Sequence, residues 1–236
     1  VAIKSAVAGG AAREASADRV DRDLVRGETG VGDVELRHLV ASACGELVDL
    51  LLQELDAVTS GRELTALGRE LAKLPLDPRV GRMILAGRDE GVLAEVLIIA
   101  AALSVPDPRE RPLERQSAAD QAHHRFKDDR SDFLSFIHLW DFFTDALALG
   151  LSHRKLVDHC RAHFVSTLRV REWRDIHSQL TEILREAGWN VPALAPARER
   201  PKDGARAGPA KAAADVRFEK IHRALLTGLL GNIGCR

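Results

Sequence analysis

The chain has 236 residues, of which 45% are hydrophobic and 29% charged, and its formal net charge is −1. This composition is typical of a soluble globular protein with a sizeable core. No apolar run approaches the roughly 20 residues that a membrane span needs, which excludes a membrane-spanning protein. With a net charge this close to zero, any binding of nucleic acid has to depend on a local basic surface.

Three cysteines, Cys44, Cys160 and Cys235, lie far apart in the sequence. An odd number at this spacing excludes a disulfide framework and a CxxC site. The N-terminus has no charged-then-apolar leader, so nothing indicates secretion. We therefore expect a cytoplasmic protein. The chain starts with Val and ends shortly after an apolar helix, and we expect it to be a piece of a longer protein.

The run GETGVG at residues 27–32 looks like the start of a phosphate-binding P-loop. Such a loop needs Lys and Ser or Thr straight after its last glycine, to neutralise the outer phosphates and to hold Mg²⁺. Asp33 and Val34 occupy those two positions, so we expect no nucleotide or metal cofactor in this chain. Residues 1–35 are rich in Ala, Gly, Arg and Asp, with little periodicity, and we expect residues 1–46 to form a leader that is disordered or out of register.

Residues 47–76 predict a small winged-helix-like module. The leucines of GELVDLLLQELDAV, which starts at Gly45, recur at helical spacing. TSGRELTAL (59–67) predicts a turn and a short extended segment. GRELAKLPL (68–76) predicts a short amphipathic helix that Pro75 ends.

Residues 77–189 predict a helical bundle. Asp77 is expected to cap a helix that has Pro78 at its first position. Ser131 or Asp132 is expected to cap a later helix. The apolar stretch 93–104 predicts a buried helix. In chain order, helices are expected at 77–91, 93–104, 115–129, 131–150, 152–165 and 166–188.

The helix expected at 131–150 carries a series of large apolar side chains that we expect to form the bundle centre, with Trp140 deep inside it. The series consists of Phe133, Phe136, Ile137, Trp140 and Phe143. A Pro/Ala/Gly-rich linker follows over 190–215, and a terminal helix over 216–236. Since no strand–helix–strand alternation occurs, we expect a mainly all-α fold, a degenerate winged helix followed by a helical bundle.

Five blocks of sequence follow one another along the chain. They are ELTALGRELAKLPLDPRVGRMIL, LIIAAALSVPDPRERP, HHRFKDDRSDFLSFIHLW, LRVREWRDIHSQL and IHRALLTGLLGNIG. In this order they resemble the helicase-associated region of DEAH-box ATP-dependent RNA helicases, specifically of the bacterial HrpA type. The resemblance covers roughly residues 47–234, apart from the linker.

The resemblance implies a degenerate winged helix and a helical ratchet domain, which in that family follow two RecA-like motor domains and precede an OB-fold. It implies a region that lines the RNA channel of a 3′–5′ helicase, with single-stranded RNA, the motor domains and the OB-fold as partners. ATP and Mg²⁺ belong to the full-length parent. The chain has no GxxxxGKT loop and no DEAH tetrapeptide, so alone it should not hydrolyse ATP.

The resemblance also accounts for the P-loop likeness near the N-terminus. A GDVE-like segment lies before the winged helix in the family, and residues 32–35 read GDVE at about the right distance. We therefore interpret the likeness to a P-loop as accidental. The family's Phe/Pro-rich stretch after this tetrapeptide is replaced here by LRHLVASACGELVD, which leaves the register of residues 1–46 open.

The segment RVREWRD places three arginines, Arg169, Arg171 and Arg174, around Trp173. Cationic side chains beside one aromatic ring are typical of sites that bind single-stranded RNA, because arginines pair with the phosphates and a base stacks on the indole. The alternative for Trp173 is a core position with the arginines on the surface, and we favour it for this side chain. The arginines are the strongest candidates for contact with RNA.

Two further basic groups are candidates for phosphate contact. HHRFKDDRSD contributes Arg125, Lys127 and Arg130 before a helix start, although its aspartates also allow an internal salt-bridge network. Arg79 and Arg82, three residues apart, share one helical face, where solvated surface arginines are the alternative.

His159 and His163 lie one helical turn apart with Cys160 between them, a spacing that zinc sites use. Further ligands are missing from the sequence, so we expect helical surface histidines and no metal. A stand-alone winged-helix DNA-binding or adaptor protein remains an alternative function, although GRELAKL mixes Arg69 and Lys73 with Glu70. A helical fragment without function is the third alternative.

Overall fold

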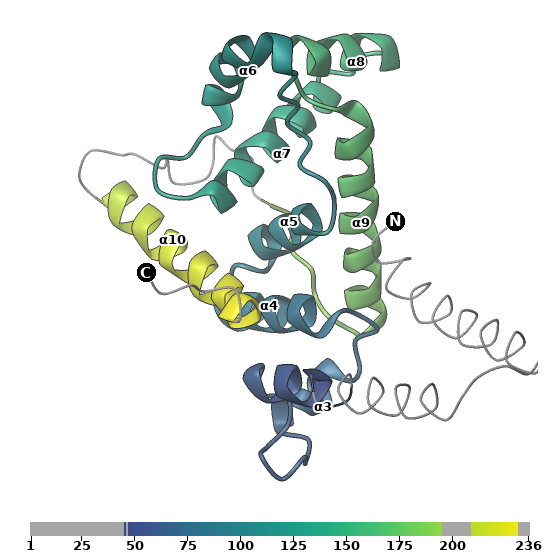
Figure 1. The fold of residues 1–236 in the computed structure, drawn as a ribbon, viewed down its shortest axis with the longest axis vertical. Helices are drawn as coiled ribbons and strands as arrows, with labels where there is room; N and C mark the ends of the chain where they lie inside the picture. The colour runs from purple at the N-terminus through teal and green to yellow at the C-terminus, as the bar shows by residue number, and fades with distance from the viewer. Residues whose placement is uncertain (1–44, 46, 195–208, 231–236) are drawn as a thin grey trace, which may run out of the picture. The chain divides into compact units, whose positions relative to one another are not determined.

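The computed structural model describes residues 45, 47–194 and 209–230 (Figure 1). The chain divides into two compact units, one of residues 1–82 with 227–236 and one of residues 83–226.

In chain order the elements are α3 (Ala66–Leu71), α4 (Pro78–Asp89), α5 (Leu93–Leu103), η1 (Leu113–Arg115), α6 (Gln116–His123), η2 (His124–Phe126), α7 (Asp132–Ala148), α8 (His153–Ala162), α9 (Thr167–Glu186) and α10 (Pro209–Leu229). Residues 47–54 are also helical. The described residues contain no strand, and the all-α expectation is confirmed.

The first unit contains the winged-helix part, in which the described residues form helices and one isolated bridge. In place of the predicted extended segment, the structure has a single antiparallel bridge between Val58 and Leu64. α3 begins at Ala66, two residues before the predicted start, because the Thr65 hydroxyl caps it by accepting a hydrogen bond from the Gly68 amide at 2.9 Å. A Cβ at Gly68 would lie 1.9 Å from the Ala57 carbonyl oxygen, so this turn requires glycine.

The predicted helix caps of the bundle are confirmed. The Asp77 carboxylate accepts hydrogen bonds from the amides of Arg79 and Val80, at 2.9 and 3.3 Å, at the start of α4. The Ser131 hydroxyl accepts one from the Phe133 amide at the start of α7. Each cap satisfies backbone donors that have no partner inside their own helix.

α5 is the central helix of the second unit. Nine of its eleven residues are buried, as expected for a helix that is apolar on every side. α7 and α9 both pack against α5, and Figure 1 shows α9 running along one side of α5 and α7. The largest fully buried side chain is Trp173 of α9, whose indole N–H donates to the Ile98 carbonyl of α5 at 2.8 Å.

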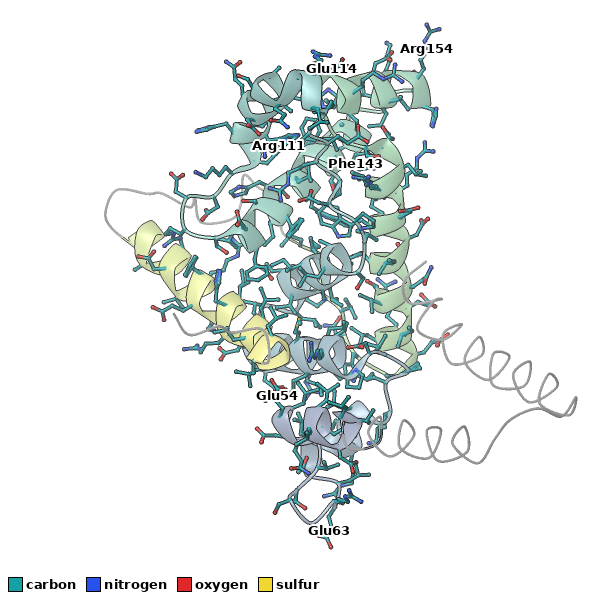
Figure 2. All side chains as sticks on the ribbon, viewed as in Figure 1. Glu54, Glu63, Arg111, Glu114, Phe143 and Arg154 are labelled. Carbon is teal, nitrogen blue, oxygen red and sulfur yellow. The ribbon has the colours of Figure 1, made fainter. Side chains whose placement is uncertain are left out.

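The aromatic series of α7 is only partly internal, which corrects the expectation from sequence. Ile137 and Phe143 are buried, whereas Phe133, Phe136 and Trp140 are partly exposed. Figure 2 shows Phe143 inside the bundle between α7 and α9. Trp140 lies against the edge of Trp173, with ring centroids 5.1 Å apart, and therefore covers the centre of the core without forming it.

α10 begins at Pro209, inside the segment predicted as linker, and not at residue 216. Residues 195–208 of that linker lie outside the described residues, as do residues 1–44 of the predicted leader. Ala214, Ile221, Ala224 and Leu225 give α10 a buried apolar side. Ion pairs from α10 to Glu90 and Glu95 hold it against the α4–α5 turn. None of the described helices is both long and apolar enough to cross a membrane.

We predict that Trp173→Ala lowers the free energy of unfolding by about 3–5 kcal/mol, as large core truncations do. Trp140→Ala should cost only about 1–2 kcal/mol because its ring is partly exposed. The matched control is Leu168→Ala, since this side chain lies on the same helix as Trp173 and is 67% exposed. It should change the free energy of unfolding by no more than about 0.5 kcal/mol. Urea unfolding followed by circular dichroism gives all three values. A larger loss for Trp140→Ala than for Trp173→Ala would contradict this description of the core.

Candidate nucleic-acid interface

The start of α9 is held in place by the loop that precedes η1. The Ser166 amide donates to the Pro108 carbonyl and the Glu110 amide donates to the Phe164 carbonyl, both at 2.8 Å. Arg109 and Val165 form an isolated antiparallel bridge between these hydrogen bonds. Two chain segments that are far apart in sequence therefore fix the position from which α9 begins.

Arg169 strengthens this attachment. Its Nη1 donates to the Asp107 carbonyl at 2.8 Å, and its side chain is only partly exposed. One of its donors is therefore used inside the protein, although the positive charge is not neutralised by a carbonyl. Arg169 is better placed to orient the start of α9 than to bind a ligand alone.

Arg171 and Arg174 are exposed on the same helix. No carboxylate in the described part of the chain forms an ion pair with either of them. The guanidinium of Arg174 lies over the Phe143 ring, 5.7 Å from its centroid, an arrangement that holds a cation in place without neutralising it. These two arginines therefore keep their charges and hydrogen-bond donors available to a partner.

Trp173 lies in the core, as the alternative interpretation of this residue expected. Its exposed fraction is 0%, and its indole N–H is already bonded to Ile98. The indole cannot stack on a base, so Trp173 is removed from the candidate RNA-binding residues. It contributes to the interface only by fixing the rotation of α9.

A mixed-charge cleft of about 460 Å³ adjoins this region, lined by Asp107, Arg109, Arg111, Asp120, His123, His124, Lys127 and Asp132. Its main cations are already paired. Arg109 Nη2 lies 2.6 Å from Asp107 Oδ2, and Arg111 lies 2.6 Å from Asp120. Burial raises the pKa of Asp107, but hydrogen bonds from Arg109 outweigh it and lower that pKa overall. The cleft is electrically balanced and offers little attraction to a polyanion.

The second predicted basic group is dispersed among internal partners. Arg125 Nη1 lies 2.6 Å from His163 Nε2, Lys127 pairs with Asp129 at 3.6 Å, and Arg130 pairs with Asp215 of α10 at 2.6 Å. These contacts favour the salt-bridge network that was the alternative for this segment. Arg125 contacts His163 in the short connection between α8 and α9.

Arg79 and Arg82 lie in the first turns of α4, in the unit formed by residues 1–82 and 227–236. Both side chains are partly exposed. The Arg82 carbonyl accepts a hydrogen bond from the Thr227 hydroxyl at 3.3 Å, a backbone contact that leaves the guanidinium unaffected. Their contact with RNA stays a prediction, separate from the α9 group.

Three cations on α8 were missed by the sequence analysis. Arg154, Lys155 and Arg161 are exposed, and Figure 2 shows Arg154 on the outer side of α8. α8 contacts α9, and the positive charge of Arg171 acts on Cys160 of α8. The signal in the sequence was the basic spacing of HRKLVDHCRA.

His159 of α8 and His163, which follows that helix, take part in packing. His159 stacks on Phe142, with ring centroids 4.5 Å apart, and burial lowers its pKa. His159 and His163 have ring centroids 5.1 Å apart. Among the described residues, no group of three or more His, Cys, Asp and Glu side chains could hold a metal ion.

His177 lies one turn after Arg174 and packs on Trp140, with ring centroids 4.7 Å apart. Burial, with a smaller contribution from the charge of Arg174, lowers the pKa of His177 from 6.5 to about 4. The imidazole is therefore neutral at pH 7 and adds no charge to the arginine face.

This lowered pKa predicts a loss of stability in acid. The unfolded chain takes up a proton at His177 below pH 6.5, whereas the folded chain takes it up only near pH 4. The contribution of His177 is therefore fully present above pH 6.5 and is lost as the pH falls toward 4, by up to about 3 kcal/mol. We expect His177→Gln to unfold with a shallower pH dependence than the wild type over this window.

The measurement is urea unfolding at several pH values for wild type, His177→Gln and the control Ser178→Ala, at the neighbouring exposed position. Taking differences from the wild type cancels the titration of carboxylates common to all three. Equal pH slopes for wild type and His177→Gln would show that the imidazole is not buried as described.

Comparison with families of known proteins gives two adjoining matches. Residues 50–76 match the helicase associated domain (HA2), winged-helix, and residues 77–136 match the helicase associated domain (HA2), ratchet-like. The first match covers residues 50–54 of the first described helix and all of α3, and the second begins at the Asp77 cap of α4.

Individual proteins give the same result. The chain is 40% identical over 191 residues to the ATP-dependent RNA helicase HrpA of Escherichia coli, which covers 79% of this chain and 13% of that helicase. It is 39% identical over 193 residues to the HrpA homolog of Haemophilus influenzae, again 13% of its length. The ATP-dependent DNA/RNA helicase DHX36 of Homo sapiens is 37% identical over 139 residues, which are 58% of this chain and 14% of that protein.

The chain thus spans a small part of the relatives that it matches. Their similarity extends well beyond the two HA2 matches, since 191 aligned residues exceed the range 50–136. The chain belongs to the helicase-associated (HA2) family and has the winged-helix and ratchet-like parts found in HrpA-type DEAH-box helicases.

Proposed function

We propose that this chain is the RNA-holding accessory region of an ATP-dependent RNA helicase and contacts single-stranded RNA through Arg171 and Arg174. The observation that carries the proposal is the pair of exposed arginines without carboxylate partners in the described chain, on a helix fixed at its start. The relatives are named as RNA helicases, which supplies the class of ligand.

The contact is one with the RNA backbone. A guanidinium fork matches the geometry of phosphate oxygens, whereas base recognition needs accessible aromatic rings or base-edge donors. With Trp173 buried, its indole cannot stack on a base. We therefore infer binding with little sequence preference and a strong dependence on salt.

In the longer protein, this region would line one wall of the RNA channel and the RecA-like motor domains the other. The motor domains would use ATP and Mg²⁺ to move RNA in the 3′–5′ direction, with an OB-fold following the ratchet part. The chain's own contribution is to hold the strand between motor steps and to help separate paired strands. We place this activity in the cytoplasm.

A stand-alone winged-helix protein that reads DNA is the second candidate, and the geometry of α3 disfavours it. α3 has only six residues, and Arg69 Nη1 donates to the Leu64 carbonyl at 2.8 Å. A helix that reads the major groove presents several free side chains along its length. α3 is better suited to packing.

We predict that the Arg171→Ala/Arg174→Ala double variant binds mixed-sequence single-stranded RNA more weakly than the wild type. Each lost phosphate contact should lower the slope of log K against log salt by about 0.7, the value for single strands. Arg169→Ala should change the slope less, because this side chain is anchored to Asp107. Filter binding across a salt series measures each slope.

The matched control is Lys73→Ala/Arg185→Ala, which removes the same charge from exposed positions elsewhere in the chain. Circular dichroism establishes that all variants are folded. If the Arg171/Arg174 variant and the control give the same salt slope as the wild type, the RNA contact lies elsewhere. If both double variants lower the salt slope equally, the effect reflects only the overall charge of the chain and not a contact at Arg171 and Arg174.

We further predict that the chain alone shows no saturable binding of Mg²⁺-ATP by calorimetry. The reason is that Asp33 and Val34 stand where a P-loop needs Lys and Ser or Thr. This stretch lies outside the described residues, so the prediction rests on sequence chemistry. Micromolar binding that disappears in Gly32→Ala would contradict it.

A further inference from the structure

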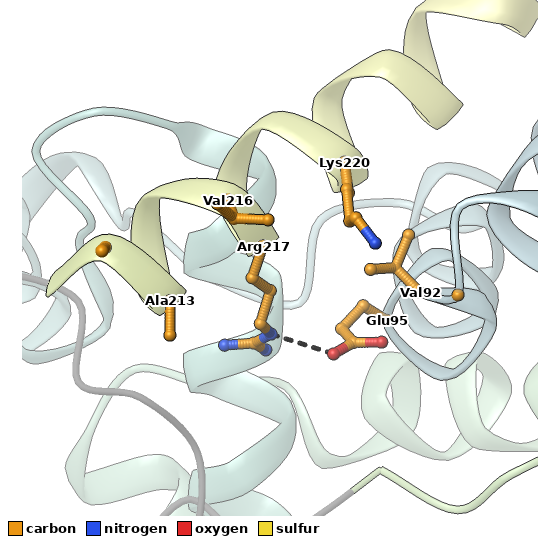
Figure 3. Close-up of a pocket in the computed structure, with 8 residues that line it drawn as sticks. Val92, Glu95, Ala213, Val216, Arg217 and Lys220 are labelled. Atoms are coloured by element: carbon orange, nitrogen blue, oxygen red, sulfur yellow. Dashed lines mark hydrogen bonds and ion pairs between the residues drawn. The ribbon is translucent and has the colours of Figure 1, made fainter. Parts of the chain in front are cut away.

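A pocket of about 470 Å³ lies between α10 and the turn that joins α4 to α5 (Figure 3). Its walls are mostly small and apolar, and two cations and one carboxylate converge on it. The lining residues are Gly91, Val92, Glu95, Ala212, Ala213, Val216, Arg217 and Lys220. This volume, with apolar walls and few polar groups, is typical of sites for small ligands.

Arg217 is the main polar group of the pocket. Its Nε donates to Glu95 Oε1 at 2.9 Å, and the two side chains are only 14% and 13% exposed. Figure 3 shows Arg217 reaching from α10 toward Glu95, with Lys220 one turn further along the same helix. The ion pair is monodentate, since only Nε of the guanidinium contacts the carboxylate.

The second terminal nitrogen of Arg217, Nη2, is buried and has no hydrogen-bond acceptor among the described residues. Leaving a charged donor in this state is unfavourable, and buried groups of this kind are rare in folded proteins. Since Nη2 itself has almost no accessible surface, an acceptor that entered with a small shift of the covering side chains would remove this cost.

The net charge of the residues that line the pocket indicates what charge the acceptor carries. Glu95 neutralises one of the two cations, so the pocket has a net charge of +1. The Lys220 ammonium donates to the Glu90 carbonyl at 3.0 Å, which leaves two of its three protons for a ligand. A monoanion balances the pocket, whereas a phosphate monoester would bring excess negative charge beside Glu95.

We propose that this pocket binds a carboxylate attached to a short aliphatic group, with Arg217 and Lys220 holding the carboxylate and Val92 and Val216 contacting the aliphatic part. Either a small carboxylic acid or the carboxyl terminus of a polypeptide presents this chemistry. The site is separate from the arginine face of α9, so it does not depend on RNA binding.

N-acetyl-leucine is the probe, because it combines one carboxylate with a branched aliphatic side chain. Titration into the whole chain, followed by the ¹H–¹⁵N shifts of Gly91 and Val92, should give a Kd on the order of 1 mM, as expected for a ligand of this size. N-acetyl-leucinamide, which lacks the charge, should bind at least about tenfold more weakly. Inorganic phosphate should also bind at least about tenfold more weakly.

Two variants and one control test the assignment. Lys220→Gln should weaken binding about tenfold, and Ala213→Leu should block the pocket while leaving the ion pair intact. Lys155→Gln, an exposed lysine on α8, removes the same charge away from the pocket and should bind as the wild type does.

A peptide ending in a free leucine carboxylate distinguishes the two sources. Tighter binding than N-acetyl-leucine would assign the pocket to a polypeptide terminus, and equal binding to a small acid. The proposal is overturned if the acid and the amide bind equally, if phosphate binds as well as the acid, or if the Lys220 and Ala213 variants bind unchanged. Absence of shifts in the wild type at 20-fold the expected Kd, about 20 mM, would also overturn it.

Discussion

The hydrogen bond from the Trp173 indole to the Ile98 carbonyl fixes the arrangement on which the candidate interface depends. It joins residues that are 75 positions apart and lies fully inside the bundle. Because a helix advances about 100° per residue, burial of Trp173 determines the direction of every neighbouring side chain on α9. Val170, Ile176, Leu180 and Leu184 follow it into the core. Arg171 and Arg174 therefore have to face outward.

Sequence alone predicted the features that local chemistry determines. The caps at Asp77 and Ser131 and the apolar run of α5 each depend on residues within a few positions of one another. The features that it missed depend on distant contacts. Trp140 was expected at the centre because aromatic residues repeat along α7, but which of two tryptophans lies deepest is decided by how α9 packs on α5.

The candidate site was predictable to a similar extent. Composition identified a basic segment at Arg169–Arg174, but it could not separate arginines with partners from those without. Arg130 pairs with Asp215 across 85 positions, and Arg125 contacts His163 across 38. No local pattern signals such pairs, since both partners look like surface residues. Only the packed structure shows that Arg171 and Arg174 have no carboxylate partner in the described chain.

The same constraint applies to α10, whose position creates the pocket at Arg217. Its buried apolar side consists of alanines together with Ile221 and Leu225, and ion pairs to Glu90 and Glu95 supplement it. A buried ion pair offers little net stability, because desolvation of both groups offsets their attraction. Arg217 Nη2, which has no acceptor among the described residues, weakens the docking of α10 further. A carboxylate that binds only the docked arrangement would stabilise it by mass action, so occupancy of the pocket and attachment of α10 are thermodynamically linked.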